Sequence, residues 1–131
     1  MKTPLTYNTV GQYLQEKVPE FSEKVKEHLK YYDGTILQHV LFGDFTRFII
    51  DQFEKSKNNP EAKDVFVRSV NFIEELLRAN DDYLTNLVAA SFLENLHEPE
   101  DYYVYQRALS PFFGPKTLAL ARSMEEYEKR D

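Results

Sequence analysis

The sequence predicts an all-α protein, a compact single-domain bundle (residues 1–131) of about six or seven antiparallel helices. Three observations predict this fold class. Apolar residues recur at spacings of three and four rather than two, which is the pattern of one face of a helix. The chain contains only four glycines and six prolines, too few for a fold with many tight turns. The loops between the periodic segments are short, as between antiparallel neighbours in a bundle.

The first three predicted helices are separated by a proline and by an Asp-Gly pair. The first covers about residues 9–18, and the second begins with Pro19, a residue favoured in the first helical turn. The second helix is expected to end at residues 33–34, because glycine supplies the left-handed conformation that follows many helices. The third helix begins after Thr35, a good N-cap residue, and extends to about residue 57.

The remaining helices follow from similar signals. The Asn-Asn-Pro sequence at 58–60 provides a cap and a first-turn proline for the fourth helix. The fifth, DYLTNLVAASFLENL at 82–96, is apolar almost all round, which is typical of a buried helix. The chain breaks again at Pro111, which separates a helix over 101–109 from one over 115–129. The third and fifth helices are expected at the centre.

Composition excludes several kinds of chemistry. The chain has no cysteine, so disulfides, thiolate catalysis and cysteine-based zinc sites are impossible. Neither a Gly-x-Ser-x-Gly nucleophile motif nor a glycine-rich phosphate loop is present. We therefore expect a protein without enzymatic activity and without a cofactor.

Charge and hydropathy point to a protein partner. The net charge of −6 disfavours nucleic acid, which needs a basic surface, and favours a basic protein. The start of the chain, MKTPLTYNTVGQYLQ, lacks the apolar core of a secretory leader, and no segment has the ~18 apolar residues of a membrane-spanning helix. The expected location is cytoplasmic, with no membrane contact.

The apolar stretch LQHVLFGDFTRFII contains three residues that chemistry could use. His39 and Asp44 are five positions apart, so on one helix their side chains point about 140° apart and cannot form a dyad. Arg47 can pair with Asp44 or with Asp51 on the helix surface. Gly43 lies in mid-helix, where glycine often marks a close helix approach. We predict a structural role: a tight crossing at Gly43, held by the Asp44–Arg47 pair.

A metal site is a weaker alternative. Glu94 and His97 have the Glu-x-x-His spacing found in carboxylate-bridged di-iron bundles. Such a centre needs a second copy, but the residues three positions before His28 and His39 are valine and isoleucine. A structural alternative is that His97 lies favourably near a helix C-terminus. We therefore predict no bound metal.

The segment HEPEDYYVYQR combines acids and tyrosines without a nearby cation before its final arginine. Acidic and tyrosine side chains together at a loop–helix junction are typical of an interface with a basic partner. The hypothesised partner-binding residues are Glu98, Glu100, Asp101, Tyr102 and Tyr103. The alternative is a solvated loop with one or two tyrosines packed inward. The KYYDG sequence at 30–34 and the NDDY sequence at 80–83 repeat the same combination more weakly.

Two phrases, HVLFGDFTRFI at 39–49 and SFLENL at 91–96, resemble a group of small bacterial proteins of uncharacterised function. These proteins are similar to the all-helical, cytosolic companions of polymorphic toxins, a class that includes contact-dependent growth-inhibition immunity proteins. The resemblance implies an immunity protein that binds a cognate, cationic and nuclease-type toxin domain and covers its active site. It implies no catalytic residue. A regulatory or scaffolding interaction module without a toxin partner remains the alternative, followed by a small metalloenzyme.

Overall fold

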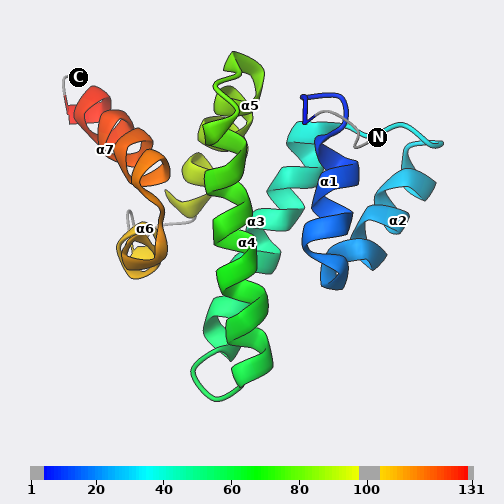
Figure 1. The fold of residues 1–131 in the computed structure, drawn as a ribbon, viewed down its shortest axis with the longest axis horizontal. Helices are drawn as coiled ribbons and strands as arrows, with labels where there is room; N and C mark the ends of the chain where they lie inside the picture. The colour runs from blue at the N-terminus through cyan, green and yellow to red at the C-terminus, as the bar shows by residue number, and fades with distance from the viewer. Residues whose placement is uncertain (1–4, 98–103, 130–131) are drawn as a thin grey trace.

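The computed structural model describes residues 5–97 and 104–129, and it confirms the predicted all-α bundle for this part of the chain (Figure 1). The N-terminal helices are α1 (Val10–Lys17), the short 3-10 helix η1 (Pro19–Phe21), α2 (Ser22–Tyr31), α3 (Gln38–Lys55) and α4 (Pro60–Arg78). The others are α5 (Asp82–Leu87), the π-helix η2 (Val88–Leu93), the 3-10 helices η3 (Glu94–His97) and η4 (Ser110–Phe112), α6 (Val104–Leu109) and α7 (Pro115–Lys129). None of the described residues lies in a β-strand.

Local signals set the end of α2 and the start of α4 as predicted, whereas Pro19 opens the 3-10 helix η1 and α2 begins only at Ser22. Gly34 has a φ of +83° and donates its N–H to the carbonyl of Leu29 at 2.7 Å, which closes the C-terminus of α2. The side chain of Asn59 accepts hydrogen bonds from the N–H groups of Glu61 and Ala62, while Pro60 occupies the first turn of α4.

The predicted cap at the start of α3 is wrong. The N-cap residue is Leu37 rather than Thr35, and no side chain caps this helix end. The N–H of Leu37 instead donates to Nε2 of His28 on α2, at 2.9 Å. The acceptor for the N–H of Leu37 therefore comes from His28, nine residues earlier, and not from a neighbouring cap residue.

The α3 and α4 helices pack against each other in the middle of the molecule, with α1 and α2 on one side and α6 and α7 on the other (Figure 1). The core between them is rich in phenylalanine. The buried ring of Phe45 lies 5.2 Å from that of Phe21, 5.7 Å from that of Phe42 and 6.4 Å from that of Phe72, measured between centroids. Burial of such rings supplies much of the apolar area that stabilises a small domain.

The fifth predicted helix is not one continuous α-helix. It begins as α5, continues as the π-helix η2 and ends as η3. At Ser91 its backbone carbonyl accepts hydrogen bonds from the hydroxyl of Thr46 on α3, at 2.7 Å, and from the side-chain amide of Asn95, at 2.6 Å. Apolar periodicity does not distinguish these helix types, because they differ in the spacing of their backbone hydrogen bonds.

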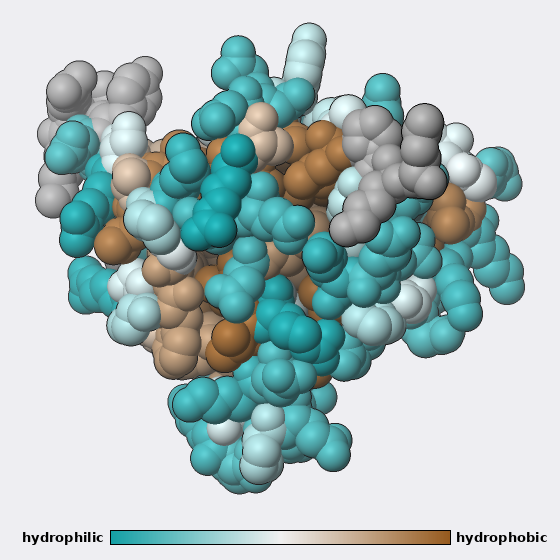
Figure 2. All heavy atoms as spheres, viewed as in Figure 1, coloured by the Kyte–Doolittle hydropathy of each residue, from teal (hydrophilic) through white to brown (hydrophobic). Residues whose placement is uncertain are grey.

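Polar side chains cover most of the face shown in Figure 2, and apolar residues are visible between them. The turn between α3 and α4, at the bottom of that view, is polar. No helix of the described residues has both the length and the apolar character needed to cross a membrane.

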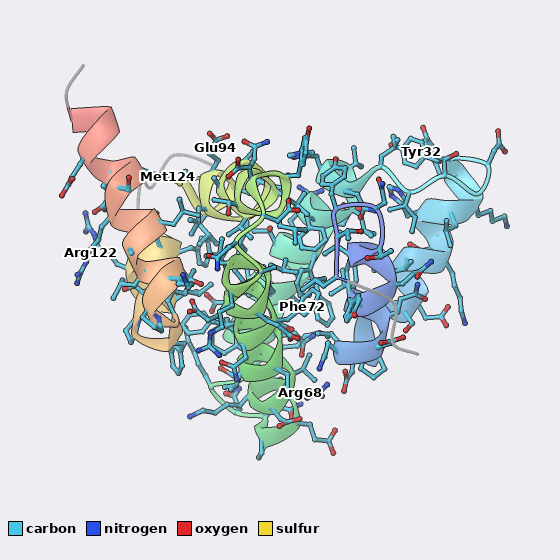
Figure 3. All side chains as sticks on the ribbon, turned by 45° about the horizontal axis from the view of Figure 1, so that its top comes forward. Tyr32, Arg68, Phe72, Glu94, Arg122 and Met124 are labelled. Carbon is cyan, nitrogen blue, oxygen red and sulfur yellow. The ribbon has the colours of Figure 1, made fainter. Side chains whose placement is uncertain are left out.

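One arginine connects elements that are far apart in sequence. Arg68 on α4 donates to both carboxylate oxygens of Glu20 in η1, at 3.0 and 2.5 Å, and to Asp64 at 3.0 Å. It also donates to the carbonyl of Lys17, at the end of α1, at 3.3 Å. Figure 3 shows Arg68 near the lower end of α4. This side chain therefore fastens the α1–α2 connection to the central helix.

Candidate partner-binding groove

The five predicted interface residues lie outside the described residues. These are Glu98, Glu100, Asp101, Tyr102 and Tyr103. The nearest described tyrosine, Tyr105, is partly buried against the hydrophobic core. The hypothesis that these five residues contact a partner therefore stays a prediction.

Among the described contacts, His39 is joined neither to Asp44 nor to Arg47. The His39 ring shares a hydrogen bond of 2.8 Å, through Nδ1, with the hydroxyl of Ser91 on η2. Asp44 accepts a hydrogen bond from Arg47 at 2.6 Å, and Asp51 pairs with Lys55 rather than with Arg47. The prediction that His39 and Asp44 make no dyad on this helix agrees with these contacts.

The predicted clamp at Gly43 is wrong. The Arg47 and Asp44 side chains are 68% and 41% exposed, and the pair joins two residues of the same helix. A Cβ on Gly43 would meet only the side chains of Asn95, at 3.6 Å, and Arg47, at 3.8 Å, which are ordinary contacts. Within residues 5–97 and 104–129, no neighbouring backbone approaches this glycine closely enough to require it.

The Glu94-x-x-His97 spacing falls on the 3-10 helix η3 rather than on an α-helix. Among the described residues, no group of three or more His, Asp or Glu side chains is placed to hold a metal ion. The weaker alternative of a metal centre thus gains no support from the described part of the chain.

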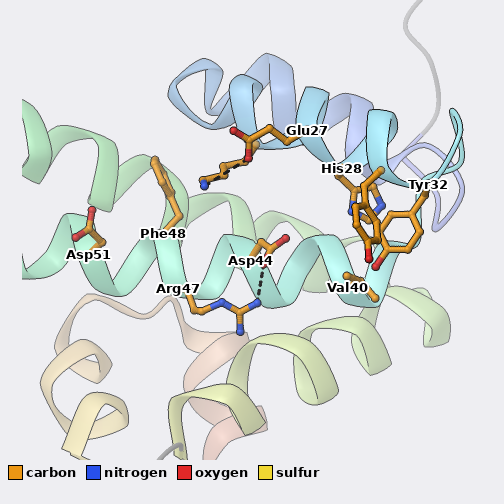
Figure 4. Close-up of a pocket in the computed structure, with 10 residues that line it drawn as sticks. Glu27, His28, Tyr32, Val40, Asp44, Arg47, Phe48 and Asp51 are labelled. Atoms are coloured by element: carbon orange, nitrogen blue, oxygen red, sulfur yellow. Dashed lines mark hydrogen bonds and ion pairs between the residues drawn. The ribbon is translucent and has the colours of Figure 1, made fainter.

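The most suggestive surface feature is a groove between α2 and α3, with a volume of about 610 Å³ (Figure 4). This volume is within the range of small-molecule and side-chain binding pockets, roughly 300–1,000 Å³. From α2 and its C-terminal end the lining residues are Lys24, Glu27, His28, Tyr31 and Tyr32. From α3 they are Val40, Asp44, Arg47, Phe48 and Asp51. We call this feature the α2–α3 groove.

Aromatic rings form one end of the α2–α3 groove. The centroid of the Tyr32 ring lies 4.7 Å from that of buried His28 and 4.8 Å from that of Tyr31. His28 is fixed by the hydrogen bond that its Nε2 accepts from Leu37. Tyr31 is 80% exposed and Val40 on the opposite helix is 43% exposed, so apolar surface at this end faces solvent. Exposed aromatic side chains held on a rigid base are common at protein interfaces.

Charged side chains border the rest of the α2–α3 groove. Three carboxylates and two cations line it, which leaves a net charge of −1 (2 − 3). Glu27 is 3.6 Å from Lys24, and Asp44 is paired with Arg47. All four side chains are exposed, so each ion pair is worth only about 0.2–1 kcal/mol. Such weak pairs are easily exchanged for contacts with a partner.

A second exposed tyrosine lies in the first turn of α5. Tyr83 is 72% exposed and its ring lies 6.2 Å from that of Tyr7, which in turn lies 5.9 Å from His39. The α2–α3 connection, the segment before α1 and the α4–α5 turn all lie along the upper edge of the molecule in Figure 1. The two minor acid–tyrosine segments of the sequence, KYYDG and NDDY, are therefore on one edge.

The chain is similar to a protein family that has no assigned function. No curated protein and no solved structure matched the chain. A family model described as a domain of unknown function (DUF7674) matches residues 11–129, from the second residue of α1 to the last residue of α7. Because this match spans most of the sequence, the chain belongs to the DUF7674 family, a domain of unknown function.

Proposed function

We propose that this protein is an immunity protein that binds a cationic, nuclease-type bacterial toxin domain and neutralises it by covering the active site. The observation that carries the proposal is the high exposure of Tyr31 and Tyr83, each of which lies within two residues of an exposed aspartate. An inhibitor of this kind needs a rigid complementary surface and no catalytic group of its own.

The two tyrosine positions have the composition of an interface centre. Tyr31 is followed by exposed Asp33, and Tyr83 is preceded by Asp81 and exposed Asp82. Tyrosine is enriched among the residues that dominate binding energy, because it buries a large rigid area and keeps a hydroxyl for hydrogen bonding. Acidic neighbours add electrostatic attraction for a basic partner and accelerate the encounter. The net charge of −6 extends this attraction over the whole molecule.

The test begins with the gene directly upstream: if it encodes a toxin domain, that domain is expressed in host cells and rescue by this protein is measured. Co-expression of the protein in a host that lacks both genes is expected to restore growth, and the two purified proteins are expected to form a complex. Tyr31→Ala and Tyr83→Ala are each expected to weaken the complex, by about 30-fold if the ring is a buried anchor worth about 2 kcal/mol. Asn71→Ala, at an exposed position of α4, is the control and is expected to leave affinity unchanged.

Growth arrest despite co-expression, together with no complex between the purified proteins, would refute the proposal. A stable complex with a protein that is harmless when expressed alone would instead support a regulatory or scaffolding role. In either case, the tyrosine variants test whether the surface around Tyr31 and Tyr83 contacts the partner. Circular dichroism serves as the folding control, and both tyrosines are exposed enough to be replaced without loss of core packing.

A further inference from the structure

We propose that the α2–α3 groove is a guanidinium-binding site: an arginine side chain of a basic protein partner stacks on Tyr31 and pairs with Asp44. This inference rests on the proposed function only in taking the partner to be a basic protein. It adds the chemical group that the groove takes and names the intramolecular contact that must open for binding.

The first element of the site is its aromatic wall. Tyr31 and Tyr32 pack edge to face, and Tyr32 in turn packs on the buried ring of His28. The 80% exposure of Tyr31 leaves most of its ring surface open to a ligand. Cations are attracted to the faces of tyrosine rings, and a planar guanidinium stacks there better than an ammonium group.

The second element is a carboxylate on each side of the groove. Figure 4 shows Glu27 on α2 and Asp44 on α3, bordering the groove from opposite helices. A guanidinium presents a planar set of donors that matches a carboxylate geometrically. A side chain lying between the two helices can therefore stack on the aromatic wall while it donates hydrogen bonds to Asp44.

The third element is an internal cation that the ligand would displace. Arg47 donates to Asp44 at 2.6 Å, but both side chains are exposed and belong to the same helix. Lys24 likewise forms an ion pair with Glu27 on the same helix. A partner arginine gains aromatic stacking that Arg47 does not have in this arrangement, and this gain favours the exchange. The same internal cations make the groove a poor site for an anion, because each is already paired and a third carboxylate, Asp51, also lines it.

The experiment is an NMR titration of the whole protein with N-acetyl-arginine amide, and separately with the uncharged isostere N-acetyl-citrulline amide. The arginine compound is expected to shift the ring signals of Tyr31 and Tyr32 at millimolar concentration, whereas the citrulline compound is not. Tyr31→Ala and Asp44→Asn are expected to reduce the affinity several-fold. Asn71→Ala, which changes an exposed residue of α4 outside the groove, is expected to leave the affinity unchanged.

Arg47→Ala provides the sharpest test because its predicted effect has the opposite sign. Removing the competing internal cation is expected to tighten binding of N-acetyl-arginine amide by about twofold, the factor that a weak exposed ion pair allows. Weaker binding by this variant would overturn the proposal, as would equal shifts with both compounds or no shift with either. The probe contains no toxin, so this outcome is independent of the growth-rescue test of the proposed function.

Discussion

Glu74 on α4 accepts hydrogen bonds from both the backbone N–H and the hydroxyl of Thr117 on α7, each at 2.8 Å. It also accepts the N–H of Lys116 at 3.1 Å, so a buried carboxylate caps the first turn of α7. A negative charge at this end of a helix is favourable, because free N–H groups point toward it. The pairing attaches the C-terminal helix to the central one.

We predict that Glu74→Gln lowers the free energy of unfolding by about 1.5–3 kcal/mol at neutral pH, the usual contribution of hydrogen bonds to a charged acceptor. Burial opposes ionisation of this carboxyl, but hydrogen bonds from Thr117 and Lys116 and the charge of Arg78 hold its pKa below the ordinary value. Urea denaturation of both proteins at neutral pH measures the difference. Glu75→Gln, at the next position and only partly buried, is the control and is expected to have little effect.

The same difference is expected to depend on pH. Because the pKa of Glu74 is lower in the folded than in the unfolded state, the ionised group stabilises the fold above the ordinary pKa. This stabilisation is lost as the pH falls through the lowered folded value. The stability gap between wild type and Glu74→Gln should therefore shrink in acid, and a gap that stays constant to low pH would contradict the assigned role.

The second prediction compares two glycines. A Cβ on Gly114 would overlap the carboxylate of Glu74, so Gly114→Ala should displace that side chain and cost about 1–3 kcal/mol. A Cβ on Gly43 has room, and alanine is about 1 kcal/mol better than glycine within a helix, so Gly43→Ala should be neutral or stabilising. Thermal unfolding of the two variants measures both effects. If the two rank in the reverse order, both packing assignments are wrong.

Some helix ends are determined by a few neighbouring residues and could be predicted from the sequence. Gly34 sets the C-terminus of α2, and Asn59-Pro60 sets the N-terminus of α4. The conformational preferences of these residues act within a few positions of the chain. The Glu74–Thr117 contact spans 43 residues, and apolar periodicity carries no information about such a pairing. The ends of these helices could therefore be predicted, whereas the attachment of α7 and the division of the fifth predicted helix into α5, η2 and η3 could not.

The candidate site was predictable only in part. The acid–tyrosine character of KYYDG was visible in the sequence, and Tyr31 is the most exposed of the large hydrophobic side chains described. The groove itself depends on how α2 packs beside α3, which the spacing of apolar residues does not specify. Val40, an exposed apolar residue on the opposite helix, is a local signal of that surface.

The third prediction contrasts two arginines in ion pairs. Arg68→Ala should cost about 1–2 kcal/mol, a value kept low because the side chains involved are about a third or more exposed and solvent screens them. Arg47→Ala should cost only about 0.2–0.5 kcal/mol, since its pair is exposed and local. Chemical denaturation of both variants gives the comparison, and an Arg47 effect larger than the Arg68 effect would restore the clamp at Asp44.

The Arg68 effect should also depend on pH. The hydrogen bond from Arg68 lowers the pKa of the Glu20 carboxyl in the folded state. Stability from this pair is thus present above the ordinary pKa of Glu20 and is lost as the pH falls through the lowered value. The wild type and Arg68→Ala should therefore approach each other in acid. Glu20→Gln is expected to show the same convergence, because it removes the other half of the pair.

The last prediction concerns the hydrogen bond between His39 and Ser91, which joins α3 to η2 at 2.8 Å. A histidine beside a serine hydroxyl is also the pattern of an activated nucleophile, but among the described residues no carboxylate forms an ion pair or hydrogen bond with His39 to orient it. We therefore expect a structural contact. Ser91→Ala and His39→Ala should each lower stability, and a double-mutant cycle should give a coupling of about 0.5–1.5 kcal/mol. A fluorophosphonate probe should leave Ser91 unmodified in the wild type. Covalent labelling of Ser91 that disappears in His39→Ala would instead identify a catalytic pair.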